Sequence, residues 1–261
     1  MTVAMAYDSL PVSVVTALYL RTKTLHLEAE RSGIIRELLR GNANRDGYIL
    51  LLRNLLPAYR AMELGLARHR KTPGIGALAH YRLDRAPAIE SDLAALCGGT
   101  WQHDIPLLPA GDRYARRITE AGQGNGARLI AHAYTRYLGD LRGGPILQRL
   151  LARSLELRPA ELSFYEFPRY PDLAALKAAY REALDRAGAF AGEQEAVVEE
   201  GALAFTINID LSYAVQAALQ PATNAAEIDW DKPHLLFGIV AAGCPRRVPD
   251  QVLQHLRRTK R

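Results

Sequence analysis

Apolar residues along this chain recur three and four positions apart, and the alternation of apolar and polar residues that marks a strand is nearly absent. Such spacing gathers apolar side chains on one face of a helix. The sequence therefore predicts an all-α protein, and a helical chain of 261 residues can bury a single core. The expected helices lie near residues 12–40, 45–70, 91–97, 112–121, 125–157, 172–187 and 193–219.

The end of the chain differs from the rest. Residues 221–248 lose the helical periodicity, and residues 221–261 contain several prolines, so we expect a helical domain over residues 1–220 and an extended basic tail over residues 221–261 with one short helix near 249–258. From Pro245 onward there are six Lys or Arg residues and one acid, Asp250. Since the whole chain has 33 Lys and Arg and 28 Asp and Glu residues, the charges before Pro245 balance. A neutral body gives no support for nucleic-acid binding.

The expected location follows from features that the sequence lacks. No apolar run reaches the roughly 18–20 residues of a membrane-spanning helix, and no basic segment precedes a long apolar one near the N-terminus. The two cysteines, Cys97 and Cys244, form no CxxC pair and suit a reducing compartment. We therefore expect a cytoplasmic protein without a membrane span.

The segment from Tyr134 to Pro145 contains three glycines and a proline within an otherwise helical pattern. Each interior glycine costs about 0.8–1 kcal/mol relative to alanine and an interior proline about 3 kcal/mol, so another interaction must offset this loss. Gly139 and Gly143 are four residues apart and share one helix face. A face without side chains admits a second backbone or a flat ligand, and Asp140 places an acid where the helix bends.

The first expected helix contains a second unusual face. His26 shares this face with small residues, which leaves room beside the imidazole for a large group, and Glu30 can accept the other ring N–H from one turn away. An ordinary core or boundary histidine beside a helix-packing glycine would give the same spacing. The spacing alone leaves both interpretations open.

Other kinds of site find little support. The glycine-rich run at residues 122–126 follows no strand and lacks the GxGxxG spacing of a dinucleotide site. None of the seven histidines has a glutamate three positions before it, as a di-iron helix bundle requires. No serine or cysteine lies in an obvious nucleophile elbow, so hydrolase chemistry is unsupported.

Two runs of the sequence together resemble the heme oxygenases, which open heme to biliverdin and release iron and carbon monoxide. Residues 131–141, AHAYTRYLGDL, followed by Gly143 and Gly144, are similar to the distal-helix signature of that family. The run from Thr22 to Glu30 is similar to its proximal signature. Shorter matching pieces extend the resemblance over about residues 12–219.

The resemblance implies an all-α fold with heme b between a proximal helix and a kinked, glycine-rich distal helix. His26 is then the proximal ligand of the heme iron, and Glu30 holds the imidazole in orientation. The glycines leave one face of the distal helix without side chains, so that its backbone can lie almost on the porphyrin. The other residues implied to bind heme in this way are Gly139, Gly143, Gly144 and Phe205.

For the chemistry, the resemblance points to Asp140, which in the family holds a hydrogen-bonded water cluster that carries a proton during ring hydroxylation. Its implied partners are Tyr59, Arg136 and Asn208. A simpler interpretation of Asp140 is an ion pair with Arg136 one turn away, worth about 0.3–0.5 kcal/mol on an exposed helix face. Both interpretations can hold.

Three side chains are implied to hold the heme propionates: Lys177, Arg181 and Tyr134. Without the resemblance, a lysine and an arginine four residues apart would indicate a solvated helix face. The sequence departs from the mammalian-type pattern, which has a lysine, a small hydroxyl residue and a glutamine in place of Tyr19, Arg142 and Pro145 respectively. The biliverdin isomer therefore stays open.

Heme is both substrate and cofactor in the implied reaction, which also consumes O2. The chain shows no flavin, nicotinamide or iron–sulfur motif, so the electrons come from a separate protein, whether a ferredoxin, a flavodoxin-like protein or a flavoprotein reductase. An acidic donor would suit a basic rim around Lys177, Arg181 and Arg142. The alternative is a non-catalytic heme carrier or sensor, although the presence of both the acid and the glycines favours an enzyme.

Overall fold

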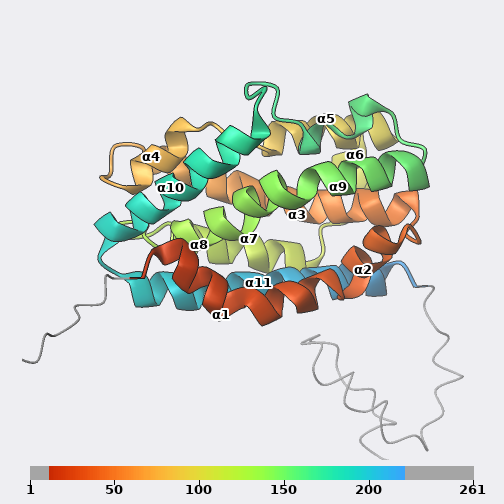
Figure 1. Cartoon of the computed structure of the whole chain (residues 1–261). Coiled ribbons are helices and arrows are strands. Elements are labelled where there is room, and N and C mark those ends of the chain that lie inside the picture. Colours follow the sequence, from red (N-terminus) through yellow and green to blue (C-terminus); the bar gives the residue numbers. More distant parts are fainter. Residues whose placement is uncertain (1–11, 221–261) are drawn as a thin grey trace, which may run out of the picture. The chain divides into compact units, whose positions relative to one another are not determined.

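The computed structural model describes residues 12–220, and within this range the chain is helical and contains no strand. The predicted all-α fold class is therefore confirmed (Figure 1). Most elements are α-helices, η1 is a π-helical turn, and η2 and η3 are 3-10 turns. In order they are α1 (Val14–Glu30), α2 (Gly33–Arg40), α3 (Arg45–Arg68), α4 (Ile75–His80), α5 (Ala86–Cys97), α6 (Trp101–Asp104), α7 (Pro109–Ala121), α8 (Leu129–Ala133), η1 (Tyr134–Leu138), α9 (Gly139–Ser154), η2 (Pro159–Glu161), η3 (Ser163–Tyr165), α10 (Leu173–Ala191) and α11 (Gln194–Ala218).

The helix boundaries follow the capping chemistry of the sequence. The side chains of Ser13, Asn44 and Asp172 accept hydrogen bonds from free backbone N–H groups in the first turns of α1, α3 and α10. Gly41 ends α2 with a φ of +72°, a left-handed conformation that glycine adopts without strain. Short polar residues and one glycine thus set several of these boundaries.

The long helices pack around one core. α1 lies along α11, and α3 packs against both α7 and α5 (Figure 1). α11 also contacts α2, α7 and α8, while α9 contacts α2 and η3. Through these contacts, residues far apart in the sequence come to line one pocket.

The structure corrects the first predicted helix, which is broken into α1 and α2. Gly33 has a φ of +34°, and a Cβ atom there would lie only 2.3 Å from the carbonyl oxygen of Ser212 in α11. The hydroxyl of Ser212 donates to the carbonyl of Ser32 at 2.9 Å and accepts from the N–H of Ile35 at 3.1 Å. The break thus results from a close approach to α11, which apolar spacing within the segment does not encode.

Several other expected boundaries were wrong. The short helices α4 and α6 were not predicted, and α5 begins at Ala86, earlier than expected, with Pro87 in its first turn where no N–H is needed. The long glycine helix begins at Leu129 and contains the π-helical turn η1. The expected tail and its helix near 249–258 lie outside the described residues.

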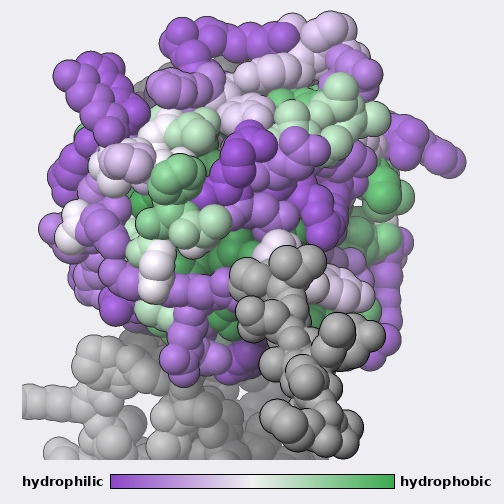
Figure 2. All heavy atoms as spheres, turned by 60° about the vertical axis from the view of Figure 1, so that its left-hand side comes forward, coloured by the Kyte–Doolittle hydropathy of each residue, from purple (hydrophilic) through white to green (hydrophobic). Residues whose placement is uncertain are grey.

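Several large apolar side chains are exposed, among them Leu64, Phe190 and Tyr213. Figure 2 shows one side of the molecule, on which hydrophobic side chains occur in patches between hydrophilic ones. Exposed apolar side chains of this kind are ordinary in folded proteins and indicate no site by themselves. Within residues 12–220, none of the helices combines the length and the hydropathy needed to span a membrane.

Candidate functional site

A pocket lies between α1, α2, α9 and α11, and η3 contributes to its wall. It contains about 910 Å³ that protein atoms do not fill, counting the part open to solvent. This volume suits a ligand or cofactor of several hundred Å³. The lining residues are His26, Ala29, Glu30, Ser32, Ile35, Leu38, Leu51, Leu55, Thr135, Arg136, Gly139, Asp140, Gly143, Gly144, Leu147, Phe164, Tyr165, Phe205, Asn208, Leu211 and Ser212.

One wall of the pocket is bare helix backbone. A Cβ atom built on Gly139 or Gly143 would meet no heavy atom within 4 Å, and one on Gly144 would lie 3.5 Å from Cδ1 of Tyr165. The space beside the first two glycines is therefore open, so close packing against another helix does not explain them. The π-helical turn η1 ends directly before Gly139, and such turns commonly distort helices at functional sites.

His26 lines the pocket from α1. Its Nδ1 lies 3.4 Å from Oε1 of Glu30, and the two side chains are 57% and 50% exposed. The ring of Phe205 packs beside the imidazole, with ring centroids 5.7 Å apart. This exposure argues against an ordinary core histidine. Because Glu30 engages Nδ1, the other ring nitrogen, Nε2, is left to bind a metal.

Asp140 lies at the centre of a polar network. Tyr59 donates to Oδ2 of Asp140 at 2.5 Å, and the guanidinium of Arg136 donates to the same tyrosine hydroxyl at 2.8 and 3.0 Å. Arg136 also donates to Oδ1 of Asn208 at 2.7 Å, and its Nη2 lies 3.6 Å from Oδ1 of Asp140. The structure thus brings together the four residues that the sequence analysis grouped.

The environment of this network tunes its charges. Burial raises the pKa of Asp140, while the cation of Arg136 and the hydrogen bond from Tyr59 oppose that rise. Burial also raises the pKa of Tyr59 well above its usual value, so this hydroxyl keeps its proton and donates it. For Arg136, the neighbouring Tyr59 and Asp140 outweigh burial and raise the pKa, which keeps the guanidinium charged.

The expected propionate residues lie outside the pocket lining. Tyr134 belongs to η1, and burial raises the pKa of its hydroxyl against a hydrogen bond with Thr22 and the charges of Arg142 and Arg181. These two arginines therefore lie close enough to Tyr134 to influence it. Lys177 lies one turn before Arg181 on α10 and is partly buried.

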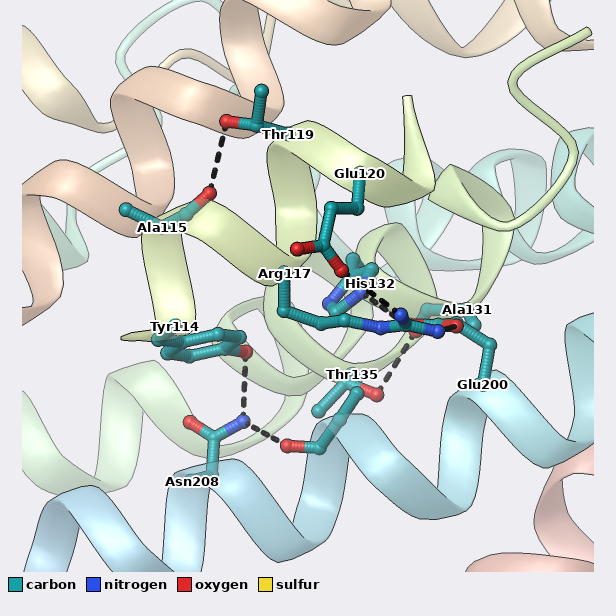
Figure 3. A network of polar contacts seen from close by, with 11 residues as sticks. Tyr114, Ala115, Arg117, Thr119, Glu120, Ala131, His132, Thr135, Glu200 and Asn208 are labelled. Carbon is teal, nitrogen blue, oxygen red and sulfur yellow. Dashed lines mark hydrogen bonds and ion pairs between the residues drawn. The ribbon is translucent and has the colours of Figure 1, made fainter. Parts of the chain in front are cut away.

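The sequence analysis missed a second buried cluster next to this network (Figure 3). Nε2 of His132 lies 2.9 Å from Oε1 of Glu200, and Arg117 donates to the same oxygen at 2.9 Å. The two clusters meet at Tyr114, whose ring lies 6.0 Å from that of His132 and whose hydroxyl accepts a 2.7 Å hydrogen bond from Asn208. The sequence signal that could have revealed this cluster is the presence of charged residues at helix positions that face the core.

Comparison with known proteins gives a consistent result. A family model described as heme oxygenase matches residues 12–214. The chain is 35% identical over 216 residues to heme oxygenase 1 of Homo sapiens, a match that covers 81% of this chain and 75% of that protein. It is 34% identical over 199 residues to heme oxygenase 1 of Nostoc sp., covering 76% of this chain and 84% of that protein.

Solved structures agree with the sequence matches. The crystal structure of heme oxygenase-1 from Synechocystis sp. in complex with heme has a TM-score of 0.75 and 29% identity, and the match covers 88% of this chain and 98% of that chain. Heme oxygenase from Leptospira interrogans has a TM-score of 0.73 and 32% identity, with 77% and 99% covered. This chain belongs to the heme oxygenase family.

Proposed function

We propose that this chain is a heme oxygenase, which opens heme b to biliverdin and releases Fe(II) and CO with O2 and electrons from a separate protein. The observation that best supports the proposal is the arrangement around one pocket. His26 offers a free ring nitrogen from α1, and Gly139 and Gly143 leave open space on α9 next to Asp140. A flat ligand that contains a metal fits these features.

His26 and the glycines would hold the heme. Nε2 of His26 would bind the iron, while Glu30, 3.4 Å from Nδ1, holds the ring in orientation. The open space beside Gly139 and Gly143 accepts a flat ring that any side chain would displace. When bound, heme supplies both the ring that is opened and the iron that activates O2.

Asp140 and its partners would manage the proton that ring hydroxylation requires. Tyr59 and Arg136 fix the carboxylate of Asp140 from the protein side, so the carboxylate can orient water at the pocket side. Asn208 fixes Arg136 in turn at 2.7 Å. Rigid support of this kind keeps a proton-carrying water in place from one turnover to the next.

The electrons would come from a separate donor protein that binds at the surface. The basic residues Lys177, Arg181 and Arg142 would attract an acidic ferredoxin, flavodoxin-like protein or flavoprotein reductase, and the first two would also hold the propionates with Tyr134. We also propose that residues 1–220 form the heme oxygenase domain, that residues 221–261 form an extended basic tail, and that the protein is cytoplasmic.

Titration with hemin tests the proposal and its alternative, a carrier or sensor. The purified protein is titrated with hemin, and a reductase system is then added in air while the Soret band is followed. Loss of that band with formation of biliverdin is expected. A Soret band that persists while the reductase system supplies electrons would identify a carrier or sensor. The absence of any Soret band would show that the protein does not bind heme.

A further inference from the structure

A second pocket, lined by other residues than the heme pocket, lies where the loop between α4 and α5 meets the segment that follows η3. It contains about 650 Å³ that protein atoms do not fill, counting the part open to solvent. Its charged lining comes from Arg82, Asp84, Arg85 and Arg169, and aromatic and proline side chains form the rest. The function proposed above does not use this pocket.

Arg85 is the fixed element of the second pocket. Its side chain is buried, with the residue only 6% exposed. Nε donates to the carbonyls of Leu83 and Asp84 at 3.2 and 2.9 Å, and Nη1 donates to those of Phe164, at 3.1 Å, and Glu166. Nη2 donates to no acceptor among the described residues, so one edge of a rigid guanidinium is left for a ligand.

The guanidinium also stacks on an aromatic ring, with its carbon 4.2 Å from the ring centroid of Phe167. This contact and the four carbonyls leave the group little freedom to turn toward another partner. The guanidinium of Arg85, which lines the pocket, is therefore held in one orientation. A preorganised donor binds an anion without a further loss of side-chain entropy.

The charges around this pocket do not balance. Among the residues that the structure describes, no carboxylate oxygen lies within 4.0 Å of a side-chain nitrogen of Arg82, Arg85 or Arg169. With Asp84, the lining carries a net charge of two positive units. Glu63 also contacts this loop. Its Oε1 accepts hydrogen bonds from the backbone N–H groups of Arg85 and Ala86 at 2.6 and 2.8 Å, and not from the guanidinium of Arg85. Arg85 is thus a buried cation without a close ion pair among the described residues, which is unusual in a folded protein, and its charge reaches Glu63 and Asp140 only over a longer distance, where it opposes the rise in the pKa of each.

We propose that this second pocket binds a phosphate group, with Nη2 of Arg85 as the fixed donor and Arg82 and Arg169 as the flexible ones. A phosphate group carries about two negative charges near neutral pH and several acceptor oxygens, which matches the excess charge of the lining. Planar guanidinium groups pair with such oxygens two at a time. The group can arrive as free phosphate or as a phosphate ester.

The second pocket adjoins a wall of the first one. Arg85 holds the carbonyl of Phe164, and the side chain of Phe164 lines the heme pocket. An anion that binds Arg85 should therefore restrain residues 163–170, because Arg85 holds backbone carbonyls of this segment. Amide hydrogen exchange in this segment is expected to slow when phosphate binds.

Calorimetry on the heme-free protein at constant ionic strength tests the site. Inorganic phosphate and adenosine monophosphate are the two probes, and acetate is the comparison anion. We expect phosphate to bind, with affinity reduced about tenfold or more in Arg82→Gln and Arg169→Gln, because each removes a charge-assisted hydrogen bond. Arg113→Gln, an exposed arginine on α7, is the control and should leave the affinity unchanged.

The outcomes separate clearly. Binding of both probes with the same arginine dependence supports a site for phosphate esters, and binding of inorganic phosphate alone supports a site for the free anion. No binding of either probe would overturn the proposal, and so would equal binding of acetate. Equal phosphate binding by the two variants and the Arg113→Gln control would overturn it as well.

Discussion

At the scale of single residues, the glycines of this chain serve two different purposes. Beside Gly139 and Gly143 there is open space, whereas a Cβ atom on Gly188 would lie 2.5 Å from Cβ of Val14. In the proposed function the first two glycines make room for a ligand, whereas Gly188 makes room for a neighbouring helix. The sequence could predict that the glycines in α9 were costly, but only the fold distinguishes these two uses.

A substitution at Gly143 tests the open wall. Gly143→Leu is expected to weaken hemin binding by about tenfold or more, because the new side chain occupies space that the ligand needs. The free energy of unfolding of the heme-free protein should not fall, since leucine is favoured over glycine in a helix by about 0.8 kcal/mol. Hemin titration and urea denaturation measure the two effects.

Gly99→Leu is the matched control, because a Cβ atom at Gly99 also meets nothing within 4 Å and Gly99 does not line the pocket. This variant should bind hemin like the native protein. Equal hemin affinity in Gly143→Leu and Gly99→Leu would show that the glycine wall does not contact the ligand.

The candidate site was predictable to different degrees. Arg136 and Asp140 are one helical turn apart, so their contact follows from the sequence directly. Tyr59 and Asn208 lie on other helices, and only the family resemblance linked them to Asp140 beforehand. Tyr114 was missed because its role depends on how α7 packs against α11, which the spacing of residues within α7 does not contain.

At the scale of elements, periodicity predicted the long helices and failed at their junctions. α3, α10 and α11 carry apolar residues at helical spacing along their whole length, and each was predicted near its observed position. The four residues of α6 and the six of α4 are too short for such a pattern to appear. The break between α1 and α2 depends on a neighbouring helix.

Gly33→Ala tests that junction. Alanine there would be strained by the φ of +34°, and its Cβ would overlap the carbonyl of Ser212 at 2.3 Å. We expect the free energy of unfolding to fall by about 2 kcal/mol or more, measured by urea denaturation. Gly99→Ala, in open space, should change it by less than about 0.5 kcal/mol. Equal stability of the two variants would refute the close approach between α2 and α11.

At the scale of the whole molecule, the cluster of Arg117, His132 and Glu200 joins α7, α8 and α11 behind the heme pocket (Figure 3). Burial disfavours the charge of Glu200, but the hydrogen bonds from His132 and Arg117 outweigh burial and lower its pKa to about 2. A carboxyl group with a lowered pKa stabilises the folded protein above its ordinary pKa and loses this effect in acid.

The cluster therefore predicts a pH dependence of stability. Between the ordinary pKa of 4.5 and the folded-state value of about 2, Glu200 should lose a stabilisation on the order of 3 kcal/mol as the pH falls. Denaturation measured from pH 6 to pH 2 should show this loss in the native protein. Glu200→Gln should be less stable at neutral pH and should lose less stability over that range, so an unchanged slope would exclude Glu200 as its source.

We propose that Asp140, beside the glycine wall, directs the opening of heme rather than its binding. The most direct test compares biliverdin formation by the hemin-loaded native protein and by Asp140→Asn, with Asp210→Asn, an exposed acid on α11, as control. We predict unchanged hemin affinity and a rate of biliverdin formation lower by about 100-fold or more for Asp140→Asn alone. Equal rates for all three proteins would contradict the account.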